Sequence, residues 1–163
     1  MKVYYTRKRE SSEAFIKRVL CERYGVDNPE IKRGGNGKPY LVNSPLKIGV
    51  SHSGELTALA VGDCEVGLDI ELRRNIKSSA IVRRLSEEER QENFFRLWTA
   101  KESYVKYLGS TLAHMLPSLK FYGGALYENG VPAPVFLTHF EIDNYCFTLC
   151  TAQKIEVETE EIL

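Results

Sequence analysis

The sequence lacks a long apolar run, an excess of charge of either sign and a recognisable targeting segment. No apolar stretch approaches the ~18 residues that a membrane-spanning helix needs, and the first residues, Met-Lys-Val-Tyr-Tyr, do not resemble a signal peptide. Lys plus Arg and Asp plus Glu number 22 each, so general electrostatics attracts neither nucleic acid nor a membrane surface. We therefore expect a cytoplasmic protein in which any anion site is local.

Cysteine is also scarce, and no two cysteines form a Cys-x-x-Cys pair. Each lies among apolar or strand-like neighbours, so we expect reduced thiols that pack in the interior, not zinc ligands or disulfides. These residues are Cys21, Cys64, Cys146 and Cys150. The composition, 43% hydrophobic and 27% charged over 163 residues, is typical of one compact globular unit.

Hydrophobic periodicity predicts two similar halves, residues 1–62 and 63–163, each with strands and helix. The predicted strands are 3–5, 40–42, 47–51, 56–61, 66–71, 120–122, 125–127, 136–142 and 145–151. The predicted helices are 12–24, 78–85 and a longer one from 86 to 108. This mixture indicates an α+β fold.

Local signals mark the helix ends. Gly25 provides a stop for the first helix, and Gly109 for the last. Ser86 and Glu89 form a capping-box pattern at the start of the last helix. We expect a break in that helix near Asn93.

Two acidic residues share one face of the strand predicted at 66–71. Apolar residues alternate there with Gly67, Asp69 and Glu71. Because side chains along a strand repeat with period two, both carboxylates project from the same face.

The helix predicted around residues 98–106 carries a third carboxylate. Residues four apart on a helix lie one above the other, which aligns Trp98, Glu102 and Lys106 in one stripe. We expect Trp98 to pack in the core and hold this stripe in place. Lys101 points roughly a quarter-turn away from Glu102, so we expect its loss to change kcat little.

If the strand face meets the helix stripe, three carboxylates converge beside one ammonium group. Mg²⁺ prefers such hard oxygen ligands and commonly keeps substrate phosphates in its shell. The pattern therefore suggests attack on a phosphate ester or anhydride. The alternative is a solvated strand face beside an ordinary surface Glu/Lys pair.

Two further segments contain groups that can bind phosphate. Ser51-His52-Ser53 ends an apolar run, where hydroxyls and an imidazole can form a phosphate cradle or simply cap a turn. No Gly-x-Ser-x-Gly elbow is present to suggest a hydrolytic triad. The glycine-rich loop 34–40 carries Lys38, but Pro39 follows the lysine where a Walker loop has Ser or Thr, and a plain connecting turn is the alternative.

The order of these four segments resembles the Sfp-type 4′-phosphopantetheinyl transferases, which move the phosphopantetheine arm of coenzyme A (CoA) onto a serine of a carrier protein. The resemblance runs from about the first predicted helix to near the C-terminus. Its segments are Gly37-Lys38-Pro39, Ser51-His52-Ser53, Gly67-Leu68-Asp69-Ile70-Glu71 and Trp98-x-x-x-Glu102-x-x-x-Lys106. The last two together are its most specific part.

The resemblance implies a fold, a set of ligands and a monomeric state. It implies two α+β subdomains related by pseudo-two-fold symmetry, with the active cleft between them. Asp69, Glu71 and Glu102 would hold Mg²⁺, or Mn²⁺, against the CoA pyrophosphate, and Lys106 would contact the phosphate. Ser51 and His52 would bind the nucleotide phosphates, with Lys38 near them.

The chain departs from this family in two places. Members often have Phe-Asn before Ser-His-Ser, where this chain has Ile48-Gly49, so the asparagine's contribution is missing or comes from elsewhere. Longer members also have a further basic segment before the first helix. Only residues 7–9 are available here, and Lys8 is the best match to a basic phosphate contact.

The resemblance predicts that a carrier serine attacks the CoA phosphorus and that 3′,5′-ADP leaves. A hydroxyl needs a base within reach, and Glu102 is our candidate, acting directly or through a metal-bound water. Lys106 and Mg²⁺ would neutralise charge on the leaving pyrophosphate. The partner is an apo acyl or peptidyl carrier protein whose pathway the sequence does not specify. Two alternatives stay open: a metal-dependent CoA phosphohydrolase and a catalytically silent carrier-binding module.

Overall fold

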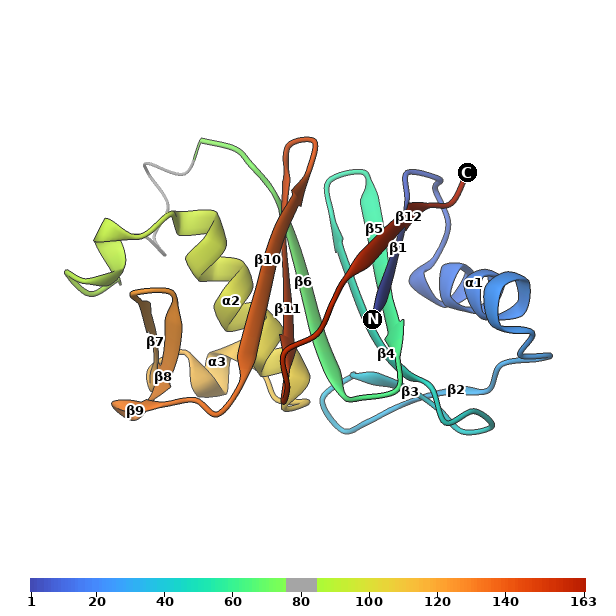
Figure 1. Ribbon diagram of the computed structural model, residues 1–163, viewed down its shortest axis with the longest axis horizontal. Coiled ribbons are helices and arrows are strands. Elements are labelled where there is room, and N and C mark those ends of the chain that lie inside the picture. Colours follow the sequence, from blue (N-terminus) through green and yellow to red (C-terminus); the bar gives the residue numbers. More distant parts are fainter. Residues whose placement is uncertain (76–84) are drawn as a thin grey trace.

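The computed structural model describes residues 1–75 and 85–163, in which strands and helices form an α+β arrangement, as predicted (Figure 1). The helices are α1 (Ser12–Tyr24), α2 (Phe94–Tyr107) and α3 (Leu112–Met115). The strands are β1 (Lys2–Thr6), β2 (Ile31–Arg33), β3 (Pro39–Leu41), β4 (Lys47–Ser53), β5 (Leu56–Gly62), β6 (Val66–Leu72), β7 (Leu119–Tyr122), β8 (Ala125–Glu128), β9 (Val131–Pro132), β10 (Phe136–Ile142), β11 (Tyr145–Thr151) and β12 (Glu158–Glu161).

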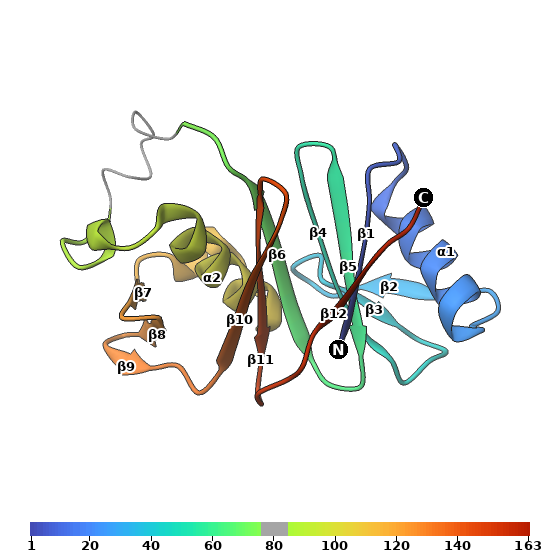
Figure 2. The ribbon, with the colours of Figure 1, turned by 45° about the horizontal axis from the view of Figure 1, so that its top comes forward.

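Two main sheets stand side by side in the centre, with one long helix on the outer side of each (Figures 1 and 2). The first sheet has the order β12-β1-β5-β4, and the second has the order β10-β11-β6. Apolar residues of β1, β5, β6 and β11 form the core that the two sheets share, including Val3, Leu56, Leu68 and Phe147. This shared core fixes the two sheets relative to each other.

The first sheet is covered by α1, as the helical spacing of its apolar residues predicts. Phe15, Ile16, Val19 and Leu20 are fully buried against this sheet. The Ser11 hydroxyl accepts a hydrogen bond from the Ala14 amide at 3.1 Å, which caps the start of the helix. The predicted stop at Gly25 is confirmed, because this residue has a φ of 61°.

The second sheet is covered by α2, whose buried residues include Leu97, Ala100 and Val105. The predicted capping box forms: the Ser86 amide donates to Glu89 Oε2 at 3.1 Å and the Glu89 amide donates to Ser86 Oγ at 3.4 Å. This capping box begins a 3-10 turn, Glu89–Gln91, and not the long helix predicted from residue 86. The predicted break near Asn93 is confirmed, since the Asn93 side chain caps α2.

Several short elements were not predicted, and one predicted helix cannot be compared. The elements β2, β9, β12 and α3 have two to four residues each, too few to show a periodicity. Residues 78–84 of the helix predicted near 78–85 lie outside the described ranges. Cys21 is exposed, unlike the buried Cys146 and Cys150, so the expectation that every thiol packs inside is wrong for this residue.

The last strand ties the two halves together. β12 pairs with β1 in parallel, from Lys2 beside Glu158 to Tyr5 beside Glu161. The sheet of the first half is thus completed by the end of the chain. No helix in the described ranges is long and apolar enough to cross a membrane.

Candidate active site

A cleft of about 330 Å³ lies between β4, β6, the loop before β3 and the C-terminal half of α2. Nearly all of the predicted site residues line it, namely Lys38, Ser51, His52, Asp69, Glu71, Glu102 and Lys106. Lys8 does not. It lines a separate, more open hollow with Arg7 and Arg9, and the exposed His52 borders both spaces.

A glycine on β6 lets α2 approach closely enough to bring the strand and helix residues together. A Cβ atom at Gly67 would lie 1.9 Å from the Ser103 carbonyl oxygen and 2.5 Å from the Tyr107 amide nitrogen. No side chain fits in that space, so only glycine permits this packing. Ser103 and Tyr107 each follow a site residue, Glu102 and Lys106, which explains why a glycine precedes the Asp-x-Glu pattern.

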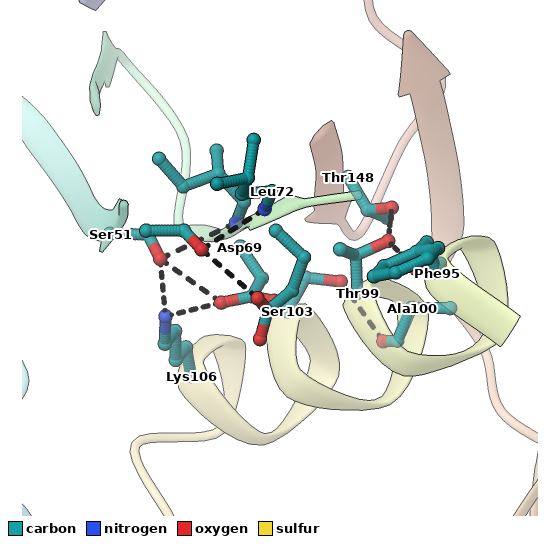
Figure 3. Close-up of polar contacts among 12 residues, drawn as sticks. Ser51, Asp69, Leu72, Phe95, Thr99, Ala100, Ser103, Lys106 and Thr148 are labelled. Carbon is teal, nitrogen blue, oxygen red and sulfur yellow. Dashed lines mark hydrogen bonds and ion pairs between the residues drawn. The ribbon is translucent and has the colours of Figure 1, made fainter. Parts of the chain in front are cut away.

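Asp69 is the centre of the polar network in the cleft (Figure 3). Only 4% of this residue is exposed. Its Oδ1 atom accepts hydrogen bonds from Lys106 Nζ at 2.7 Å and from Ser51 Oγ at 3.0 Å. Its Oδ2 atom is buried and has no hydrogen-bond partner within the described ranges. Burial raises the Asp69 pKa, and the lysine and serine only partly oppose this effect.

The pKa of Glu102 is raised to about 7. The main cause is burial, and the negative charge of Asp69 adds to it, whereas Lys106 acts in the opposite direction. Full ionisation of the three carboxylates would place more negative charge here than the single ammonium group of Lys106 balances. An added cation would relieve this imbalance.

The three carboxylates supply only oxygen atoms, the ligand type that suits a hard divalent cation. The arrangement is not a finished metal centre: in the part of the chain that the structure describes, no three His, Cys, Asp or Glu side chains are grouped as metal ligands. Glu71 is oriented by a bond from Ser53 Oγ to its Oε2 atom at 3.0 Å. Sequence reasoning did not assign Ser53 a role.

In the Ser-His-Ser segment, Ser51 is buried and His52 is exposed. Ser51 is 5% exposed, and its hydroxyl accepts hydrogen bonds from Lys106 Nζ at 2.8 Å and from the Ile70 amide at 3.4 Å. Together with its bond to Asp69, these contacts use all the hydrogen-bonding capacity of a hydroxyl. His52, the next residue along β4, is exposed at the cleft rim. The imidazole is thus accessible to a ligand, while the serine is part of the carboxylate network.

The glycine-rich loop is docked onto the C-terminal end of α2. Lys38 Nζ bonds to Glu65 Oε2 at 2.9 Å and to the Tyr107 carbonyl at 3.0 Å. Asn36 Nδ2 donates to the Gly109 carbonyl at 2.7 Å. These contacts hold the loop at the cleft, and sequence reasoning missed Asn36.

Two residues of α2 differ from their predicted roles. Trp98 is half-buried and stacks on Phe94 with ring centroids 6.0 Å apart, so it lies at the edge of the core. Lys101 is 2% exposed and pairs with the buried Glu89 at 2.5 Å. The helix phase did not predict this structural role, in which removal of Lys101 would leave a buried carboxylate without its ammonium partner; the expectation that kcat changes little stays a prediction.

Comparison with known proteins gives one consistent result. Residues 65–150 match the model of the 4′-phosphopantetheinyl transferase superfamily. The chain is 30% identical over 174 residues to the 4′-phosphopantetheinyl transferase psf-1 of Bacillus pumilus. This alignment covers 93% of this chain and 73% of that protein. The chain is 34% identical over 160 residues to the 4′-phosphopantetheinyl transferase AcpT of Salmonella typhi, with coverage of 89% and 79%. It is also 25% identical over 163 residues to Sfp of Bacillus subtilis (strain 168), with coverage of 86% and 71%.

Proposed function

The chain belongs to the 4′-phosphopantetheinyl transferase superfamily, and from this we propose that it transfers the 4′-phosphopantetheine arm of CoA to a serine of an apo acyl or peptidyl carrier protein. In this reaction the serine oxygen forms a bond to the β-phosphorus of CoA, the pyrophosphate bond breaks, and 3′,5′-ADP leaves. We further propose that the enzyme acts as a cytoplasmic monomer, as its family resemblance suggests.

One observation carries this proposal: a buried carboxylate, Asp69, lies in the cleft beside an ammonium group and two further carboxylates. A surface charge cluster would not leave a carboxylate oxygen buried without a partner. Phosphoryl transfer is catalysed mainly by positioning and by stabilising charge. A cleft that concentrates opposite charges around one buried group is suited to that task.

The residues of the cleft fit a divalent cation. Asp69, Glu71 and Glu102 would hold Mg²⁺, for which the unpartnered Asp69 Oδ2 atom and the three carboxylates lining one cleft are the supporting observations. When bound, Mg²⁺ would neutralise charge on the pyrophosphate oxygens of CoA. Lys106 would add a second positive charge from the same side, because its ammonium group already lies at Asp69.

Glu102 is the base in this proposal. A serine hydroxyl is a weak nucleophile until a nearby group takes its proton. A base must lie within hydrogen-bond reach of the hydroxyl, directly or through one water, and Glu102 lines the cleft together with Asp69 and Lys106. Glu102 would accept the proton as the serine oxygen bonds to phosphorus.

Metal binding should depend on pH near neutrality. Protons compete with Mg²⁺ for a carboxylate, and the pKa of Glu102 is raised to about 7. Mg²⁺ affinity should therefore weaken as pH falls below about 7, by up to about tenfold per pH unit, and level off above it. Titration calorimetry across this range measures the effect. Glu102→Gln should bind more weakly and lose the pH dependence near neutrality; an unchanged pH profile would contradict this role of Glu102.

Lys106→Met should lower kcat by on the order of tenfold or more, because it removes the ammonium group and keeps most of the stem. Steady-state kinetics on a carrier protein measures this. Lys154→Met, at an exposed position remote from the cleft, is the matched control. A rise in KM with unchanged kcat would mean that Lys106 binds CoA without stabilising the transition state.

His52 should distinguish CoA from dephospho-CoA, which lacks the ribose 3′-phosphate. The exposed imidazole borders the hollow that Lys8 and Arg9 line, so we expect the 3′-phosphate there. A hydrogen bond to a charged group is worth about 1.5–3 kcal/mol, roughly tenfold or more in affinity. His52→Ala should raise the KM for CoA and leave that for dephospho-CoA nearly unchanged. An equal rise for both substrates would contradict the 3′-phosphate assignment.

The hydrolase alternative differs in its need for a carrier. A CoA phosphohydrolase releases 3′,5′-ADP with water as the nucleophile, whereas the transferase should release it only when an apo carrier protein is present. Chromatography of the nucleotide products with and without the carrier separates the two. Release of 3′,5′-ADP from CoA alone, at the rate seen with the carrier protein, would favour the hydrolase.

A further inference from the structure

The two main sheets meet at their edge strands, β4 and β6, which lie side by side (Figures 1 and 2). These strands belong to different sheets, yet serine side chains of β4 accept hydrogen bonds from backbone amides of β6. Ser51 Oγ accepts from the Ile70 amide at 3.4 Å, and Ser53 Oγ accepts from the Leu72 amide at 3.0 Å. The hydroxyls thus take the place of a backbone ladder across this junction.

Each of these hydroxyls also donates to a carboxylate of β6. Ser51 Oγ bonds to Asp69 Oδ1, and Ser53 Oγ bonds to Glu71 Oε2, both at 3.0 Å. An amide N–H can only donate, so it occupies a lone pair of the serine oxygen and leaves the single hydroxyl hydrogen for the carboxylate. One serine therefore fixes both the strand and the acidic side chain beside it.

The spacing of the two segments explains why both serines can act in this way. Residues two apart on a strand share a face, so Ser51 and Ser53 face Asp69 and Glu71, which are also two apart. Gly49 continues the same row, close to the Leu68 amide: a Cβ at this glycine would lie 3.3 Å from that nitrogen. His52 projects to the other side of the strand and reaches the cleft rim.

From this geometry we propose that Ser53 is a positioning residue of the active site. It joins the two sheets and holds the Glu71 carboxylate in the orientation needed to bind a divalent cation. The proposal rests on the metal-binding part of the proposed function. Partners that orient a metal ligand typically contribute 10–100-fold to metal affinity or activity, so about this range is expected for Ser53.

The test compares Ser53→Ala with Ser53→Thr, which keeps a hydroxyl on a strand-compatible side chain. Mn²⁺ affinity, measured by electron paramagnetic resonance on the purified protein, should fall by about 10–100-fold in Ser53→Ala and recover in Ser53→Thr. Hydrogen exchange followed by NMR should be faster at the Leu72 amide of Ser53→Ala, because that amide loses its acceptor. The Ile70 amide, which bonds to Ser51, should keep its wild-type rate.

Ser44→Ala is the matched control, since the Ser44 hydroxyl accepts from the Leu46 amide away from the cleft. It should leave Mn²⁺ affinity unchanged. If Ser53→Ala does not fold, Ser53→Cys takes its place, because a thiol keeps the volume but bonds weakly. We then expect the same fall in Mn²⁺ affinity and the same faster exchange of the Leu72 amide.

The outcomes separate this proposal from the proposed function. Wild-type Mn²⁺ affinity and Leu72 exchange in the folded Ser53→Ala variant would overturn the role of Ser53, even if the protein transfers phosphopantetheine. Loss of metal affinity and of Leu72 protection would support that role, even if no carrier protein were modified.

Discussion

Replacing Asp69 with alanine should lower the rate of phosphopantetheine transfer by on the order of a hundredfold or more. The substitution removes one ligand of a hard cation, and it also removes the acceptor that holds Lys106 Nζ and Ser51 Oγ in place. The loss of the metal ligand and the loss of this acceptor should therefore both lower the transfer rate. The measurement is the initial rate of carrier modification at saturating CoA and Mg²⁺.

Asp63→Ala is the control for this substitution, because Asp63 is exposed and does not line the cleft. It should keep the wild-type rate. Adding EDTA to the wild-type protein should abolish transfer, and excess Mg²⁺ or Mn²⁺ should restore it. Full activity of Asp69→Ala in the presence of the chelator would rule out the metal site.

Replacing Lys101 with alanine should destabilise the protein by about 3–5 kcal/mol, the usual cost of removing one partner of a buried ion pair. Its partner Glu89 is 3% exposed and also accepts hydrogen bonds from the Phe121 amide at 3.0 Å and the Ser86 amide at 3.1 Å. Without the lysine, this carboxylate would be buried without a counter-charge. The free energy of unfolding, measured in urea, reports the loss.

Lys17→Ala is the matched control for Lys101→Ala. Lys17 also lies on a helix and pairs with a glutamate, Glu13, but both side chains are about half exposed. Exposed pairs of this kind contribute little to stability, because water screens the two charges. A loss as small as this in Lys101→Ala would mean that the buried pair does not stabilise the fold.

The carboxylate cluster could be predicted because it depends on local periodicity. Asp69 and Glu71 share a strand face, and Glu102 and Lys106 share a helix stripe, so spacing alone places each pair. The packing of β6 against α2 is a tertiary contact, and the feature of the local sequence that points to it is Gly67. A glycine before an Asp-x-Glu strand indicates close packing only once the helix that packs there is known.

The roles of Lys101 and Ser53 could not be predicted in this way. The sequence places Lys101 off the Glu102 stripe, but burial depends on Glu89, which lies in the capping turn before α2. Ser53 acts across a junction between two sheets, and β12 pairs with a strand at the other end of the chain. Such long-range pairings leave no periodic signal in either segment.

The most direct test of the account is the intact mass of an apo carrier protein incubated with the enzyme, CoA and Mg²⁺. A panel of acyl and peptidyl carriers from fatty-acid, polyketide and non-ribosomal peptide systems allows for the unknown pathway. We predict that at least one carrier gains the mass of a single phosphopantetheine group. The gain should disappear when its acceptor serine is replaced by alanine. If every carrier keeps its apo mass while the enzyme is folded and binds CoA, the proposal that this protein is a transferase is contradicted.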